Sequence, residues 1–151
     1  MIKISKATKK EALNKDWQIF TRLHYGPDAV WQEKPFRFKA VEDGRLLGTI
    51  EGRYEPGVLY IAALMVKESA RGQGIGTMLI KRAEEFGKKL GAHRSLLFAG
   101  KDWSNRAFYD KLGFKIIGTL PDFYFHKDFV IYTRPIKNHP VSKIQKSKQK
   151  N

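Results

Sequence analysis

The chain carries the stretch Arg71-Gly72-Gln73-Gly74-Ile75-Gly76 between an apolar run at 58–66 and an amphipathic segment at 77–90. The apolar run is typical of a strand covered on both faces, and the second segment repeats apolar residues at helical spacing. The pattern therefore predicts a strand, a glycine-rich loop and a helix in succession. Because the next predicted strand, 96–99, must return beside the first, the unit requires a parallel pair of strands.

The segments upstream of this unit predict an antiparallel meander. Alternating residues at 36–41 and a second run at 46–54 flank Asp43-Gly44, which is a strong hairpin-turn signal. Nearer the N-terminus, β-branched residues at 2–5 predict a short strand. A capping-box sequence at 8–11 predicts that a helix begins at its first residue.

The segments downstream complete the predicted order of elements. Residues 105–112 predict a helix that Gly113 ends, and 115–120 and 129–133 predict two final strands. The order predicts one α/β domain of the α+β type, with a mixed, mostly antiparallel sheet flanked by helices. We place this domain at 1–136.

The composition limits the classes of function. The chain has 151 residues and no cysteine, which excludes disulfides, thiol catalysis and cysteine-based zinc sites. No apolar run approaches the ~20 residues of a membrane span, and the N-terminus lacks the apolar stretch of a signal peptide. We therefore expect a soluble, cytoplasmic protein with no membrane partner, either a monomer or a homodimer.

The charge favours an anionic partner. The sequence has 29 Lys and Arg against 15 Asp and Glu, a net charge of +14. Such a surface attracts polyanions and repels small polycations such as polyamines. The lysine-rich segment 137–151 is expected to be a disordered tail. The ribosome or RNA is a candidate partner for this tail.

The glycine loop itself predicts a pyrophosphate site. A helix N-terminus offers unpaired N–H groups and the positive end of the helix dipole, and glycines let an anion approach the backbone. Arg71 adds a permanently charged donor. Other phosphate motifs do not fit, because a Rossmann fingerprint counted from Gly72 would need a glycine at Thr77, and no Gly-Lys-Ser/Thr of a Walker loop follows.

Two motifs resemble those of a known family. The loop at 71–76 resembles the coenzyme A signature (Arg/Gln)-x-x-Gly-x-(Gly/Ala) of the GNAT family of N-acetyltransferases. The segment 105–114, which runs from Asn105 through Tyr109 to Phe114, is similar to the second motif of that family. The resemblance covers about 36–135, with both motifs in register with the predicted elements.

The resemblance implies that acetyl-CoA binds where two central strands splay apart, and that no metal is needed. Leu64, Met65 and Val66 would offer backbone groups to the pantetheine, and Asn105, Phe108 and Tyr109 would lie beside it. The pyrophosphate would be bound by the loop and the first helical residues: Arg71, Gly72, Gln73, Gly74, Ile75, Gly76 and Thr77.

The implied reaction is direct acetyl transfer to a primary amine, which can be a protein N-terminus, a lysine or a small molecule. Tyr109 would protonate the departing thiolate. The strand 58–66 has no carboxylate, so the general base is Glu51 on the preceding strand, or else Asp122 or His126.

Two alternatives to an enzyme remain open. One is a coenzyme-A-binding module without catalysis, and the other is a ribosome- or RNA-associated protein that uses the basic tail. The aromatic residues within 123–126 fit either part of an acceptor pocket or anchors of the core.

Overall fold

The structure is a computed structural model that describes residues 1–137 of the chain. The chain forms two compact units, Met1–Gln32 and Glu33–Asn151. Apart from Lys137, the predicted tail 137–151 lies outside the described residues. No helix in the described part of the chain is long and apolar enough to span a membrane.

The N-terminal unit contains helix α1 (Asn14–Tyr25). The Thr8 amide donates a hydrogen bond to Glu11 Oε2 at 2.6 Å, which is a contact of a capping box. It closes only an isolated turn, however, and the predicted helix start at Thr8 is wrong. Leu13, with φ −79° and ψ 56°, lies outside the helical region and separates this turn from the helix.

The strand predicted at 2–5 does not form. Ile2 and Ile4 are almost fully exposed. In the described residues the sheet begins at Lys34, so this segment has no neighbouring strand to receive its backbone hydrogen bonds. Its β-branched composition is therefore insufficient without a partner.

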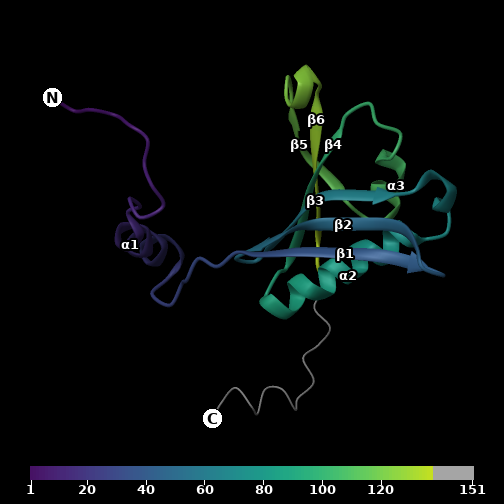
Figure 1. The fold of residues 1–151 in the computed structure, drawn as a ribbon, viewed down its shortest axis with the longest axis horizontal. Coiled ribbons are helices and arrows are strands. Elements are labelled where there is room, and N and C mark those ends of the chain that lie inside the picture. Colours follow the sequence, from purple (N-terminus) through teal and green to yellow (C-terminus); the bar gives the residue numbers. More distant parts are fainter. Residues whose placement is uncertain (138–151) are drawn as a thin grey trace, which may run out of the picture. The chain divides into compact units, whose positions relative to one another are not determined.

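The second unit is built on a six-stranded sheet with the order β1-β2-β3-β4-β6-β5 (Figure 1). The strands are β1 (Lys34–Glu42), β2 (Arg45–Glu55), β3 (Val58–Val66), β4 (Arg94–Gly100), β5 (Lys115–Leu120) and β6 (Phe129–Pro135). The pair β3–β4 is parallel and the other neighbours are antiparallel. The predicted α+β fold, with its meander and its parallel pair, is confirmed.

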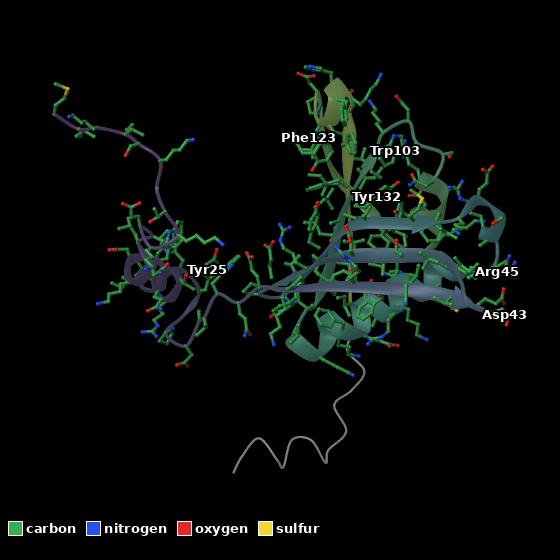
Figure 2. All side chains as sticks on the ribbon, in the orientation of Figure 1. Tyr25, Asp43, Arg45, Trp103, Phe123 and Tyr132 are labelled. Atoms are coloured by element: carbon green, nitrogen blue, oxygen red, sulfur yellow. The ribbon has the colours of Figure 1, made fainter. Side chains whose placement is uncertain are left out.

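The turn between β1 and β2 also follows the prediction. Asp43 and Gly44 have φ of 48° and 74°, as the favoured two-residue hairpin turn requires. Figure 2 shows Asp43 and Arg45 at the tip of this hairpin.

Helix α2 (Ile75–Leu90) covers one face of the sheet (Figure 1). Its residues Leu79, Ile80 and Ala83 are buried in the core. Gly87 lets the helix touch β3, because a Cβ at this position would lie 2.9 Å from Leu59 Cδ1. The helix ends at Leu90, the last residue of the predicted segment 77–90, and Gly91, with φ 102°, caps it.

Strand β3 is covered only in its first half. Ile61 is buried, whereas Ala62, Ala63 and Met65 are exposed. The prediction that both faces are covered is therefore wrong for the second half. In the same stretch, from Ile61 on, β3 is no longer paired with β4.

Candidate active site

Strands β3 and β4 separate after three paired residues. The pairs are Val58–Arg94, Leu59–Ser95 and Tyr60–Leu96. Beyond them β3 stays paired with β2 as far as Val66, and β4 stays paired with β6 as far as Gly100. The facing edges of 61–66 and 97–100 therefore enclose a gap in the sheet, the β3–β4 opening, which forms the splay expected from the resemblance. An extended ligand could pair with these backbone edges.

Three predicted cofactor residues lie on the β3 side of this opening. Met65 is exposed, and Leu64 and Val66 are half-buried. The Val66 carbonyl already accepts a hydrogen bond from Arg71 Nε at 3.2 Å. Backbone pairing with the pantetheine stays a prediction here, with one of its candidate acceptors engaged by the glycine loop.

A β-bulge lies at the same place. Glu51 is opposite Ala63 and Gly52 is opposite Ile61, so Ala62 is an extra residue of β3. Gly52 is required by this close approach, because a Cβ there would lie 1.9 Å from the Tyr60 carbonyl oxygen. Bulges of this kind bend a strand and recur next to active sites.

The glycine loop follows β3 and leads into α2. Gly72 and Gly74 both have φ +79°, and no atom lies within 4 Å of a Cβ built on either residue. A side chain at these positions would be strained by the backbone and would also fill the open space. The loop therefore exposes backbone on the side where the helix begins.

The backbone amides of this loop are free to bind an anion. Within the described residues, the amides of 72–77 donate no hydrogen bond, and the first amide to do so is that of Met78, to the Gly74 carbonyl at 3.0 Å. These N–H groups lie at the positive end of the α2 dipole. We call the seven predicted residues, 71–77, the cradle; that it binds the pyrophosphate stays a prediction.

The cradle is joined to the second motif by one close contact. Helix α3 (Arg106–Lys111) brings Phe108 against the first turn of α2, where a Cβ at Gly76 would lie 3.0 Å from the Phe108 ring. Gly76 thus leaves room for this ring, and Phe108, predicted to bind the cofactor, has a packing role in this structure.

Tyr109 lies in the adjoining aromatic cluster. Its ring is buried against Phe108, Phe114 and Tyr132, with centroid distances of 5.1, 5.8 and 5.5 Å. Within the described residues the Tyr109 hydroxyl makes no hydrogen bond. Every side-chain N or O atom that is fully enclosed there has a hydrogen-bond partner. The hydroxyl therefore retains some accessible surface.

The environment of Tyr109 keeps its phenol protonated. Burial, and to a smaller extent the neighbouring Tyr132, raises the pKa of Tyr109 above its usual value. A raised pKa favours the neutral form, so the hydroxyl carries its proton throughout the physiological range. This is the form that can donate a proton to a departing group.

Tyr132 fixes the position of α3, and sequence reasoning missed it. Its phenol is fully buried, donates to Asp110 Oδ1 at 3.1 Å and accepts from Arg106 Nε at 3.4 Å. Tyr132 lies opposite Leu97, the first β4 residue beyond the three pairs with β3. Tyr109, whose ring packs against Tyr132, is therefore held beside the β3–β4 opening.

A second brace joins both helices to the sheet. The side chains of Glu84 on α2 and Arg134 on β6 form a two-pronged ion pair, with Nε–Oε1 and Nη2–Oε2 distances of 2.8 and 2.7 Å. Glu84 Oε1 also accepts from Ser95 Oγ at 2.8 Å, and Arg134 donates to the Leu112 carbonyl at the end of α3. Both side chains are largely buried and well bonded, as a stable buried pair requires.

Two further predicted residues lie apart from this brace. Asn105 precedes α3 with an exposed side chain that makes no capping hydrogen bond. Glu51 lies on β2 opposite Ala63, and its Oε2 is 2.8 Å from Arg37 Nε. The roles of both in binding or catalysis stay predictions.

The alternative bases lie in the loop between β5 and β6. Asp122 Oδ1 and His126 Nδ1 are 2.7 Å apart, and both side chains are mostly exposed. They hold each other, and the Asp122 amide donates to Asp128 Oδ1 at 3.0 Å. These contacts help to fix the shape of the loop, and a role of either residue as the base stays a prediction.

The β3–β4 opening and the free amides of the glycine loop are the features that the sequence resemblance implied. The family model described as "Acetyltransferase (GNAT) family" matches residues 7–114. The chain therefore belongs to the GNAT acetyltransferase family, and the resemblance seen in the sequence is confirmed.

Individual relatives agree with this assignment. The chain is 35% identical over 98 residues to an uncharacterized N-acetyltransferase of Methanocaldococcus jannaschii, a match that covers 62% of each chain. It spans about three-fifths of the length of the curated relatives it matches.

Solved structures share the fold. An acetyltransferase from Bacillus cereus has a TM-score of 0.68 at 23% identity and covers 89% of this chain and 97% of its own. An aminoglycoside 6′-N-acetyltransferase complexed with coenzyme A has a TM-score of 0.63 at 20% identity, with coverage of 93% and 100%.

The cradle predicts a charge effect at Gly74. We expect Gly74→Asp to bind acetyl-CoA at least ~10-fold more weakly than Gly74→Asn, about 1.4 kcal/mol. The two side chains have the same shape, and both tolerate the left-handed backbone better than other residues, so the difference isolates the carboxylate. Calorimetric titration measures both affinities. Equal affinities would show that the pyrophosphate does not bind here.

Proposed function

We propose that the protein is an N-acetyltransferase that moves an acetyl group from acetyl-CoA to a primary amine by direct attack. The observation that carries the proposal is the set of free backbone amides at 72–77 next to the β3–β4 opening. The family supports acetyl-CoA as donor, and the related fold complexed with coenzyme A supports the same ligand.

The cradle and the opening bind the donor in this proposal. Arg71 and the amides of 72–77 hold the pyrophosphate, and the free edge of β3 around Leu64 and Met65 aligns the pantetheine. Acetyl-CoA supplies an activated acetyl group as a thioester. A backbone N–H of β3 near 64–66 is suited to stabilise negative charge on the carbonyl oxygen.

The protein's own residues move the protons. The amine nitrogen attacks the carbonyl carbon, a C–N bond forms and the C–S bond breaks, so the amine loses a proton and the sulfur gains one. Tyr109 is the proton donor to sulfur, because its phenol is neutral and its hydroxyl has accessible surface. Glu51, oriented by Arg37, is the proposed base, directly or through a water.

The net charge supports an additional proposal, a polyanionic partner such as the ribosome or RNA. This proposal rests on the sequence, since all but one residue of the lysine-rich segment lies outside the described part of the chain. An enzyme with a small or a protein acceptor is compatible with it.

The proposed reaction is tested with a panel of primary amines, with release of the coenzyme A thiol as the signal. We expect at least one amine to support turnover, and Tyr109→Phe to lower kcat about 10²-fold, the scale of a lost general acid. Stability and acetyl-CoA affinity should change little, because the hydroxyl has no partner in the described residues to lose. Single-turnover rates separate the chemical step from binding.

Two results would contradict this account. Turnover of Tyr109→Phe at the parent rate would assign the proton to solvent or to another residue. Tight binding of acetyl-CoA without release of thiol by any amine would instead favour a binding module without catalysis.

The position of Tyr109 gives a second test through Tyr132. Tyr132→Phe removes the phenol's hydrogen bonds to Arg106 and Asp110. We expect it to lower kcat about fivefold, equivalent to ~1 kcal/mol, and to leave acetyl-CoA affinity unchanged. In the Tyr109→Phe background the same substitution should have no further effect on kcat, because Tyr132 acts through Tyr109. A full fivefold effect in that background would show a general loss of structure instead.

A further inference from the structure

Four aromatic side chains form a continuous wall across the β3–β4 opening. They are Tyr60 on β3, Phe98 on β4, and Phe123 and Tyr124 in the loop between β5 and β6. The ring centroids are 5.7 Å apart for Tyr60–Phe98, 6.0 Å for Phe98–Phe123 and 4.4 Å for Phe123–Tyr124. We call this set the aromatic wall.

The wall lies on the sheet face opposite α2. Leu59 touches Gly87 of α2, and Ser95 donates to Glu84 of the same helix. Because successive side chains of a strand point to opposite faces, Tyr60 and Phe98 point away from α2. Tyr60 is the last β3 residue paired with β4, and Phe98 lies just beyond the paired part. The wall therefore lines the opening on the sheet face opposite α2. The N-terminus of α2 is part of the cradle.

The rings are held in place and still partly exposed. Phe123 and Tyr124 are 37% and 51% exposed, and Tyr60 and Phe98 are half-buried. Figure 2 shows Phe123 toward the far end of the β4–β6 strands, away from β3. Burial, and to a smaller extent nearby Tyr124, raises the pKa of Tyr60, which agrees with a shielded site at this end of the wall.

The loop that carries Phe123 and Tyr124 has an unusual backbone. Asp122, Phe125 and His126 all have φ between 50° and 58°, a left-handed conformation that is costly for residues other than glycine. The Phe123 amide donates to the Lys127 carbonyl at 2.8 Å. This hydrogen bond and the Asp122–His126 contact hold the strained loop in the shape that presents the Phe123 and Tyr124 rings.

The carboxylates around the wall already have partners. Arg53 lies 4.7 Å from the centre of the Tyr60 ring and pairs with Glu55, and Arg37 pairs with Glu51. In the loop, Asp122 contacts His126 and Asp128 accepts from the Asp122 amide. A polycationic acceptor would have to displace these contacts to reach the carboxylates. Ring surface is the recognition element that remains.

We propose that the acceptor is a small monoamine that carries an aromatic ring, with the ring bound against the aromatic wall. This inference rests on the proposed acetyltransferase function and specifies the acceptor of that same site. Offset or edge-to-face contacts with Phe98 and Phe123 orient the ring, and the amine reaches the opening. The incoming ammonium is also attracted to ring faces before it loses its proton.

The test compares 2-phenylethylamine with 2-cyclohexylethylamine, which has a similar size and the same charge but no π-system, and with the polycation spermidine. Calorimetry on the coenzyme-A-loaded protein measures binding without turnover, and thiol release from acetyl-CoA gives kcat/KM. We expect the aromatic amine to exceed both others about tenfold in affinity and in kcat/KM, the scale of two aromatic contacts.

Variants assign the preference to the wall. We expect Phe98→Leu and Phe123→Leu to reduce the preference for the aromatic amine to about twofold or less, and to leave acetyl-CoA affinity unchanged. Phe125→Leu is the control, because Phe125 lies in the same loop as Phe123 and its side chain is 94% exposed. It should keep the parent preference.

Three results would overturn the inference. They are equal affinity for the phenyl and cyclohexyl amines, stronger binding of spermidine, and loss of the preference in Phe125→Leu alone. A different result would show that the proposed function is wrong. The aromatic amine would still bind preferentially, but no amine would release thiol. The wall would then have no acceptor role. Turnover of aliphatic amines with equal efficiency would instead keep the function and reject the acceptor class.

Discussion

The parting of β3 and β4 after three residue pairs is the constraint on which the rest of the site depends. Each strand keeps its outer neighbour, so the sheet stays intact while two inner backbone edges are left free. A free edge inside a sheet is costly unless something pairs with it. The protein places a bulge at Ala62 and an anion cradle at the end of β3, so that the opening is shaped for an extended ligand.

The opening is kept rigid from the α2 side. The contact of Gly76 with Phe108 sets the distance between the two helices, and the ion pair of Glu84 with Arg134 ties both of them to β4 and β6. Tyr132 adds hydrogen bonds to Arg106 and Asp110 on α3. A proton donor is effective only when its geometry is fixed, and these contacts give Tyr109 a fixed place. On the other face, the aromatic wall combines Tyr60 and Phe98 of the two strands with Phe123 and Tyr124 of the strained loop.

Short sequence patterns predicted those parts of the fold that depend only on residues near each other in the sequence. The Asp43-Gly44 turn and the end of α2 at Leu90 each depend on a few neighbouring residues, and they lie where the sequence places them. The strand at 2–5 and the helix start at Thr8 failed, because a strand needs a partner and a capping pair needs helical residues after it. Tyr132 and the Glu84–Arg134 pair gave no signal, since their partners are distant in the sequence and only the folded sheet brings them together.

The central claim is that acetyl-CoA occupies both the cradle and the free edge of β3. Hydrogen exchange of backbone amides, measured with and without coenzyme A, tests it directly, because an amide that gains a hydrogen bond exchanges more slowly. The account predicts slower exchange at 72–77 and in the part of β3 at 61–66, with little change on the hairpin tip at Asp43. Unchanged exchange at 61–66 alongside protection of 72–77 would show that the ligand is held by its phosphates alone, and would contradict the claim.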